Sequence, residues 1–143
     1  MSRAFGPRFR RGYTAIGLAL ALFGSAQAAI LDNSIALDAV YIPALSLTNA
    51  KPGDTAAAAK ARAAMQRLDA EWPALRAALL KDLSGKAPAQ AAAARKTLAQ
   101  VDHALAEARK AMAAGNNAAA HTALEDVRTD LMKLRSAQGV DYF

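Results

Sequence analysis

The feature that most constrains this chain is a set of apolar residues that recur in steps of three and four. Three consecutive segments carry the pattern, and short polar stretches separate them. Such steps place side chains on one face of an α-helix, so each segment predicts a helix with one buried face. The repeating positions are Ala58, Ala61, Met65, Leu68, Trp72, Leu75 and Leu79, then Ala94, Leu98, Val101, Leu105, Ala108 and Met112, and finally Ala120, Leu124, Val127, Leu131 and Leu134.

Loop-forming residues set the expected ends of the helices. Glycine, proline and asparagine, which interrupt helices, gather in 48–54, 84–88 and 115–117. Short connections between helices favour antiparallel neighbours. We therefore predict an all-α fold, an up-down-up-down four-helix bundle that follows an N-terminal signal peptide. The expected helices span about 31–48, 55–83, 88–114 and 118–137.

The first expected helix has the least regular pattern. Its two apolar stripes are Ile30, Leu37, Val40, Ala44 and Leu47, and Leu31, Ile35, Ile42 and Leu45. A helix that is apolar on several sides is expected to be buried on several sides. Pro43 should kink or end it, and the triplet 40–42 leaves a β-strand as the alternative. Pro73 lies in the second helix, where the pattern keeps its phase, so we expect a kinked but continuous helix.

Residues 1–28 have the order of a cleavable signal peptide. Four arginines precede an apolar run of nine residues, 15–23, and alanines occupy the −3 and −1 positions of a cut after Ala28. A membrane anchor is the alternative, but a spanning helix needs about 20 apolar residues. The general secretory route fits better than a twin-arginine route. We expect a single domain at 29–143, located in the periplasm or secreted, with no membrane span after cleavage.

The charge of the mature chain argues against nucleic acid as a partner. The whole chain has 18 basic and 12 acidic residues, and the four arginines of 1–28 leave 14 basic residues and a net charge of +2. This is too small and too evenly spread for a nucleic-acid footprint. The chain has no cysteine, so neither disulfides nor a thiolate metal site can stabilise it. Alanine, a strong helix former that buries little area, predicts a thin core.

Histidines are the first candidates for chemistry. His103 is expected to point to solvent and His121 to lie at the edge of the core. In the antiparallel register set by the 115–117 turn they are about 12 Å apart along the bundle axis, too far for one metal ion. His121 and Glu125 are four residues apart on one face, and they could hold a divalent metal ion with help from another helix. An ordinary contact between the two side chains is the alternative.

The tryptophan, the carboxylates and the short motifs of the chain give no indication of catalysis. Trp72, the only tryptophan, is expected to anchor the core, and a platform for a ligand in a bundle pocket is the alternative. The carboxylate pairs show no sign of the desolvation that general acid–base work requires. Glycine-rich phosphate loops, nucleophile elbows and haem-attachment motifs do not occur. The sequence therefore predicts that the protein is not an enzyme.

The end of the chain is apolar. Tyr142 and Phe143 close a tail in which a polar, frayed terminus is the usual expectation. Three explanations stay open: the tail folds back on the bundle, docks on a partner, or belongs to a chain cut short. We take Tyr142 and Phe143 as candidate interaction residues.

The stretch from Val101 to Arg135 resembles the last helical hairpin of the soluble periplasmic b-type cytochromes. An alanine-rich third helix, a glycine-led turn and a long last helix with basic residues at its end carry the resemblance. It covers about a quarter of the chain and implies a four-helix bundle in the periplasm. The family's haem ligands are a methionine early in the first helix and a histidine late in the last. This chain has neither there, so no ligand carries over.

Two functions follow from these observations. The first is an exported bundle that binds an unidentified protein or small molecule, without cofactor and without catalysis. The alternative is a carrier of haem or a divalent metal on the same bundle, with His121, Glu125, Met65 and Met112 as candidates. Docking of the tail on a partner is a third possibility.

Overall fold

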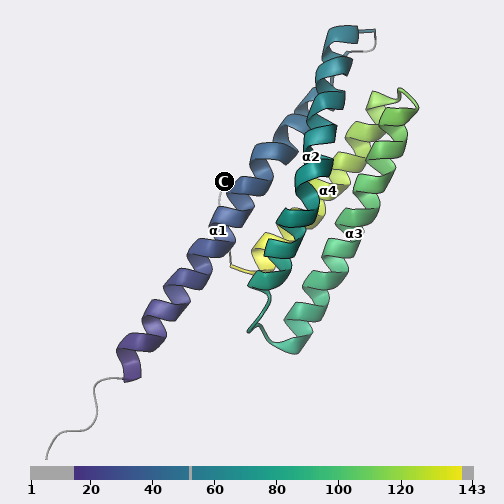
Figure 1. Cartoon of the computed structure of the whole chain (residues 1–143). Coiled ribbons are helices and arrows are strands. Elements are labelled where there is room, and N and C mark those ends of the chain that lie inside the picture. Colours follow the sequence, from purple (N-terminus) through teal and green to yellow (C-terminus); the bar gives the residue numbers. More distant parts are fainter. Residues whose placement is uncertain (1–14, 52, 140–143) are drawn as a thin grey trace, which may run out of the picture.

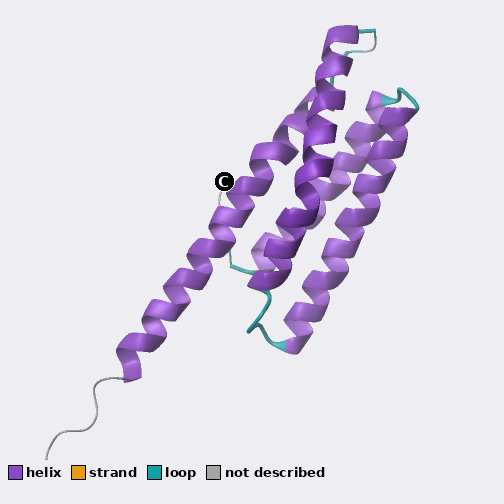
Figure 2. Ribbon diagram, in the orientation of Figure 1, coloured by secondary structure: helices purple, strands orange, loops and turns teal. Residues whose placement is uncertain are grey.

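The computed structural model describes residues 15–51 and 53–139, with side chains from residue 29 onward. This part of the chain consists of four α-helices and contains no strand (Figures 1 and 2). The helices alternate in direction, which confirms the predicted four-helix bundle. They are α1 (Ala15–Thr48), α2 (Thr55–Asp82), α3 (Pro88–Ala113) and α4 (Asn117–Ala137).

The bundle is built from two antiparallel hairpins. Helix α1 packs closely on α2, and α3 packs closely on α4. The hairpins meet mainly where α1 contacts α4, whereas α2 and α3 make far fewer contacts with each other. Each helix therefore buries one face against its hairpin partner, and α1 and α4 also bury a second flank against each other.

The predicted apolar stripes of α2, α3 and α4 face the core. Nearly all of their members are buried, and Leu98, Leu105 and Leu124 are among the largest fully buried side chains. Leu75 is half-buried against this cluster and Ala58 half-buried at the start of α2. Ala61, Ala108 and Ala120 are fully buried members of these stripes. Their small side chains let the helices approach closely at these positions.

Polar side chains cap the starts of α2 and α4. The Oδ1 atom of Asp54 accepts the N–H of Ala57 at 2.9 Å, which caps α2. Asn116 caps α4 in the same way, through the N–H of Ala119 at 3.0 Å. Gly115 has a φ of +70° in the tight turn before α4, a conformation that favours glycine. The ends of α2, α3 and the start of α4 lie within one residue of the prediction.

Helix α1 differs from the prediction in two respects. It begins at Ala15 rather than near 31. The reason is that neither a proline nor a pair of turn-forming residues separates the apolar run 15–23 from the alanine-rich residues that follow it. The strand alternative for 40–42 is wrong, because these residues are helical. Pro43 does not end α1, and Pro73 does not end α2. Both prolines are exposed, so their rings crowd no core neighbour.

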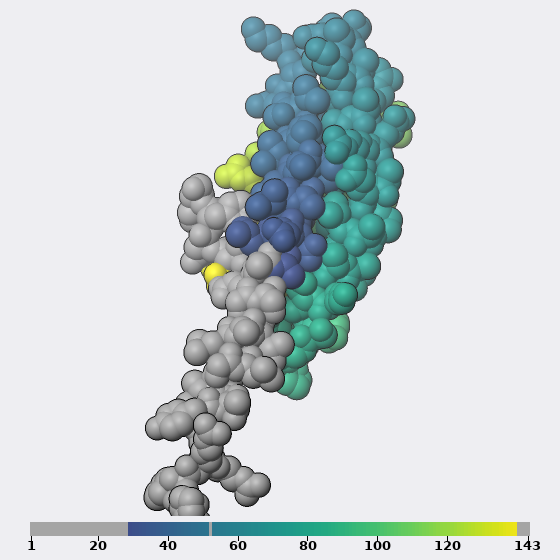
Figure 3. Space-filling view, turned by 60° about the vertical axis from the view of Figure 1, so that its left-hand side comes forward, coloured from purple at the N-terminus to yellow at the C-terminus, as the bar shows by residue number. Residues whose placement is uncertain are grey.

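Most of the second apolar stripe of α1 is not buried, which corrects the expectation of burial on several sides; Leu45 is half-buried against the core. Leu31, Ile35 and Ile42 are exposed, while Leu37, Val40 and Ala44 of the first stripe are buried. The reason is that α1 packs substantially on only two helices, α2 and α4. A face that points away from both has no neighbour among the residues that the structure describes. Figure 3 views this side, with α1 along the middle, α2 beside it and part of α4 on its other edge.

Candidate functional site

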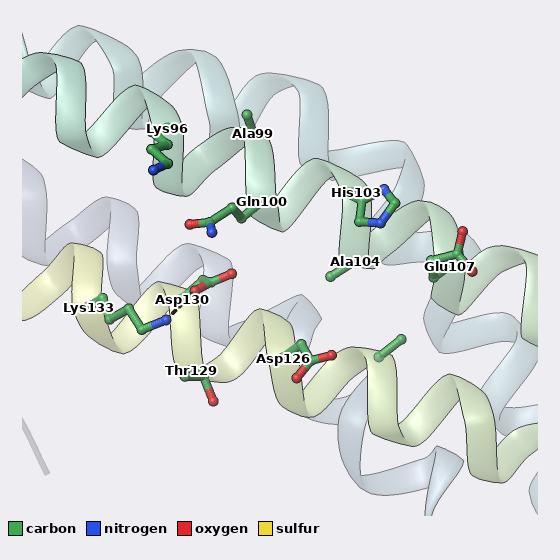
Figure 4. A pocket seen from close by; sticks show the side chains of 11 residues that line it. Lys96, Ala99, Gln100, His103, Ala104, Glu107, Asp126, Thr129, Asp130 and Lys133 are labelled. Carbon is green, nitrogen blue, oxygen red and sulfur yellow. Dashed lines mark hydrogen bonds and ion pairs between the residues drawn. The ribbon is translucent and has the colours of Figure 1, made fainter.

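A groove runs between α3 and α4 (Figure 4). It has a volume of about 660 Å³ and is open to solvent. His103 and Glu107 line it from α3, and Asp126 and Asp130 line it from α4. As predicted, His103 is exposed. The groove thus presents one imidazole and three carboxylates, with lysines toward its other end.

Three of the polar side chains in this groove make local contacts. Lys133 Nζ donates to Asp130 Oδ1 at 2.8 Å, which neutralises the one buried carboxylate. The Thr129 hydroxyl donates to the backbone carbonyl of Glu125 at 3.0 Å. Within the described residues, no three His, Cys, Asp or Glu side chains come together in a way that could hold a metal ion. The groove offers polar contacts but pairs no nucleophile with a base.

His121 ties the end of α1 to α4. Its Nδ1 lies 3.0 Å from the carbonyl oxygen of Leu45 and 3.3 Å from Thr48 Oγ1. A carbonyl only accepts hydrogen bonds, so Nδ1 carries the proton. Leu45 lies in the last turn of α1, where helix carbonyls lack partners within the helix. His121 therefore helps to close the C-terminal end of α1, a role that the sequence pattern did not show.

The predicted pair of His121 and Glu125 does meet in the structure. His121 Nε2 lies 3.8 Å from Glu125 Oε1, and both side chains are partly exposed. Arg128 donates to the other Glu125 oxygen at 3.1 Å. Met65 and Met112 lie elsewhere: they line a cleft of about 340 Å³ between α2 and α3. The structure therefore divides the four candidate ligands between two separate places, His121 with Glu125 and Met65 with Met112.

Trp72 is a core residue with a polar anchor. It is 5% exposed, and its indole Nε1–H donates to Asp102 Oδ1 at 2.8 Å. Arg76 Nε donates to Asp102 Oδ2 at 2.8 Å, so the carboxylate on α3 holds two residues of α2. The indole is therefore a packed side chain, in agreement with the core interpretation rather than the ligand-platform alternative.

A second set of polar contacts joins the hairpins across the α1–α4 seam. The buried Tyr41 hydroxyl donates to the carbonyl of Leu124 at 2.7 Å. Arg135 pairs with Asp38 and also reaches the carbonyl of Ser34. Burial raises the pKa of the Tyr41 phenol well above its usual range, and the negative charge of Glu125 adds to the shift. The sequence gives no periodic signal for such contacts, because each depends on the rotation of α1 against α4.

Four large apolar side chains remain exposed on the outer side of this seam. Leu31, Ile35 and Ile42 on α1 are 39%, 54% and 53% exposed, and Met132 on α4 is 43% exposed. We call the surface formed by Leu31, Ile35, Ile42 and Met132 the α1–α4 face. These are the exposed large hydrophobic residues found in the described part of the chain.

The four side chains share one side of the molecule. On α1, Asp38 and Tyr41 contact α4, and Leu31, Ile35 and Ile42 lie further around the helix, away from α2. On α4, Met132 lies on the flank opposite to Asp126 and Asp130, which line the groove toward α3. Both flanks therefore border the α1–α4 seam from the outside.

The part of α1 from Ala29 to Thr48 is long and apolar enough to cross a membrane by length and composition, with a mean hydropathy of 1.3. The core helix of a soluble protein and a signal sequence meet the same criterion. Here one side of the segment is buried in the bundle, where Ser34 and Thr48 are among the buried polar residues.

The candidate interaction residues Tyr142 and Phe143 lie outside the described residues, which end at 139. The predicted cut after Ala28 falls inside α1, where only the backbone is described. An apolar N-terminal helix fits a signal sequence.

Comparisons with family models, curated protein sequences and solved structures found no match to this chain.

Proposed function

We propose that this chain is an exported helical-bundle protein that acts by binding another macromolecule, not by catalysis. The signal-like order of residues 1–28 supports export to the periplasm or beyond. The polar groove between α3 and α4 pairs no nucleophile with a base. The site that best fits a function is the α1–α4 face.

The observation that carries the proposal is the exposure of Ile35 and Ile42, each about half exposed on a helix that is otherwise well packed. Single exposed apolar residues are common on protein surfaces, but several on one face indicate an interaction site. Covering the exposed half of each isoleucine would contribute about 1 kcal/mol to binding. Burial of the α1–α4 face by a partner would therefore lower the free energy of the complex.

Site-specific photo-crosslinking in cells tests this function. A photoreactive residue at position 35 or 42 should form covalent adducts on irradiation, because a bound partner would lie within reach of these side chains. The matched control is position 99, since Ala99 is exposed on α3 and borders the polar groove. We expect adducts at 35 and 42 and none at 99. Absence of adducts at all three positions would refute the proposed function.

Export has its own test. The chain should appear in the periplasmic or extracellular fraction, and mass analysis should find it shortened to begin at Ala29. Mutation of Ala26 and Ala28 to leucine should block the cut, because signal processing requires small residues at −3 and −1. Recovery of the full-length chain in the cytoplasm would contradict export.

One observation favours the second candidate function, a carrier of a divalent metal. His121 donates its Nδ1–H to a backbone carbonyl, the arrangement that orients a metal-binding imidazole. Its Nε2 then offers a lone pair 3.8 Å from Glu125 Oε1. Elemental analysis and an absorbance spectrum of the protein taken from its own compartment test this function. Absence of stoichiometric metal and of a haem band would reject it.

A further inference from the structure

We propose that the open end of the seam between α2 and α3 binds an alkyl carboxylate, a single-chain amphiphile with an anionic headgroup. This site is separate from the α1–α4 face and goes beyond the proposed function. It consists of the α2–α3 cleft of about 340 Å³ and of a loop hollow of about 590 Å³ between the α1–α2 and α3–α4 loops. Arg62, Met112 and Ala113 line both, so the two adjoin, and each has the size of a small-molecule site.

The α2–α3 cleft opens next to a polar contact that joins the two helices. Arg109 Nε donates to Asp69 Oδ1 at 2.7 Å across the seam. Met65 and Met112 follow about one helical turn beyond this pair, on α2 and α3 respectively, so the two methionines lie about level. Further along, the start of α2 and the turn between α3 and α4 lie apart (Figure 1). The ion pair therefore closes one end of the cleft, and the loops leave the other end open.

The α2–α3 cleft supplies apolar contact for an alkyl chain. Met65 and Met112 both line it, although most of their surface is buried in the core. Methionine is unbranched and polarisable, so its side chain adapts to ligands of different shape. Because α2 and α3 make few contacts with each other, a chain can lie between them without displacing a well-packed interface. This part of the site therefore fits the aliphatic part of an amphiphile.

Arg62 supplies a positive charge where the α2–α3 cleft meets the loop hollow. Its Nε donates to the carbonyl oxygen of Ala58 at 3.4 Å, and Ala58 also lines the loop hollow, so this bond holds the arginine at the edge of the hollow. In the part of the chain that the structure describes, no carboxylate pairs with Arg62. The terminal nitrogens of its guanidinium can therefore donate to both oxygens of a carboxylate.

The other charges that line the site leave this positive charge uncompensated. Asp69 is neutralised by its ion pair with Arg109. Lys51 and Asp54, which line the loop hollow, have opposite signs. Helices α2 and α4 both begin at this hollow, and the partial positive charge of their first turns adds to that of Arg62. An alkyl carboxylate would place its headgroup here and its chain between the methionines.

NMR of the methionine methyl groups tests the site, with decanoate as the probe. We expect decanoate at concentrations up to about 1 mM to shift the methyl signals of Met65 and Met112. Met132 is the internal control, because it is exposed on α4 and lines neither the cleft nor the loop hollow. Decyltrimethylammonium has the same chain with a cationic headgroup and should bind about tenfold more weakly. Equal shifts at all three methionines, no shift at Met65 and Met112, or equal affinity for the two probes would overturn the proposal.

Two substitutions separate the headgroup contact from the chain contact. Arg62→Gln should weaken decanoate binding about tenfold and leave the binding of decanol, which carries no charge, unchanged. Arg95→Gln is the matched control, because Arg95 is exposed on α3 and lines neither the cleft nor the loop hollow. Ala113→Leu should abolish binding of both probes, because it enlarges an exposed side chain that lines both parts of the site. Circular dichroism checks that the helices are retained, and unchanged decanoate affinity in either Arg62→Gln or Ala113→Leu would overturn the proposal.

Discussion

At the scale of single residues, the structure depends on a few polar side chains that fix how apolar helices rotate against one another. Asp102 is the clearest case, because its carboxylate accepts from the buried indole of Trp72 and from Arg76. A buried donor that loses its acceptor keeps the full cost of desolvation. Asp102 therefore determines which face of α2 meets α3, where the two helices make few other contacts.

Replacing Asp102 tests this role. Asp102→Ala should lower the free energy of unfolding by about 1–3 kcal/mol, because the Trp72 N–H would lose its partner. Asp102→Asn retains an acceptor oxygen and should cost less. Urea denaturation followed by circular dichroism measures both changes. Asp126→Ala, at an exposed carboxylate on α4, is the control and should change stability by less than about 0.5 kcal/mol.

From the buried phenol of Tyr41 we predict how the free energy of unfolding depends on pH. Burial raises the pKa of the phenol in the folded protein, so the folded state favours the neutral form. Its contribution is fully present below the unfolded pKa of about 10 and is lost as pH rises toward the folded pKa. Tyr41→Phe should therefore cost about 1 kcal/mol at neutral pH and show a weaker loss of stability above pH of about 10. Thermal unfolding at several alkaline pH values checks this; parallel losses in both proteins would contradict it.

At the scale of the helices, the two internal prolines differ from the proline at a helix start. Pro73 lies inside α2 and lacks the N–H that would bond within the helix, whereas Pro88 lies at the start of α3, where no such bond is lost. The two positions therefore allow a matched comparison.

Pro73→Ala should stabilise the protein by about 1–3 kcal/mol, because it restores a helix hydrogen bond at an exposed position. Pro88→Ala should change stability by less than about 1 kcal/mol. Both are measured by thermal denaturation. A lower melting temperature for Pro73→Ala would show instead that the packing of Trp72 against Asp102 needs the local geometry imposed by the proline.

The spacing of apolar residues predicted the helices and their buried faces for α2, α3 and α4. It did not predict which face of α1 is buried, and the reason is physical. The stripes of α2, α3 and α4 each have one apolar face, so the buried side was evident from spacing. Helix α1 has two apolar faces, and spacing does not say which one a neighbour covers. The contacts of His121 with Leu45 and of Tyr41 with Leu124 decide this, and they are backbone-directed bonds without a sequence period. Glu125 and His121 were predicted as neighbours because their separation of four residues fixes their proximity.

At the scale of the whole molecule, the buried residues of α1 that the structure describes begin at Ile30. In Figure 1, the earlier part of α1 extends beyond the ends of the other helices. The chain of residues 29–143 should therefore have a free energy of unfolding within about 1 kcal/mol of that of the whole chain. Urea denaturation of both proteins measures the difference. A larger loss would show that the N-terminal segment stabilises the bundle.

The continuity of α1 through the predicted cut also has an electrostatic consequence. Cleavage after Ala28 would require an unwound peptide segment, so processing would precede the final coiling of this region. The new first turn of α1 would then begin at Ala29 and include Asp32. A carboxylate in a first turn faces the partial positive charge of the unbonded amide groups there, which stabilises a helix by about 0.3–1 kcal/mol. Within the uncut helix the same aspartate lies in the interior, so removal of the leader itself would strengthen the start of the mature helix.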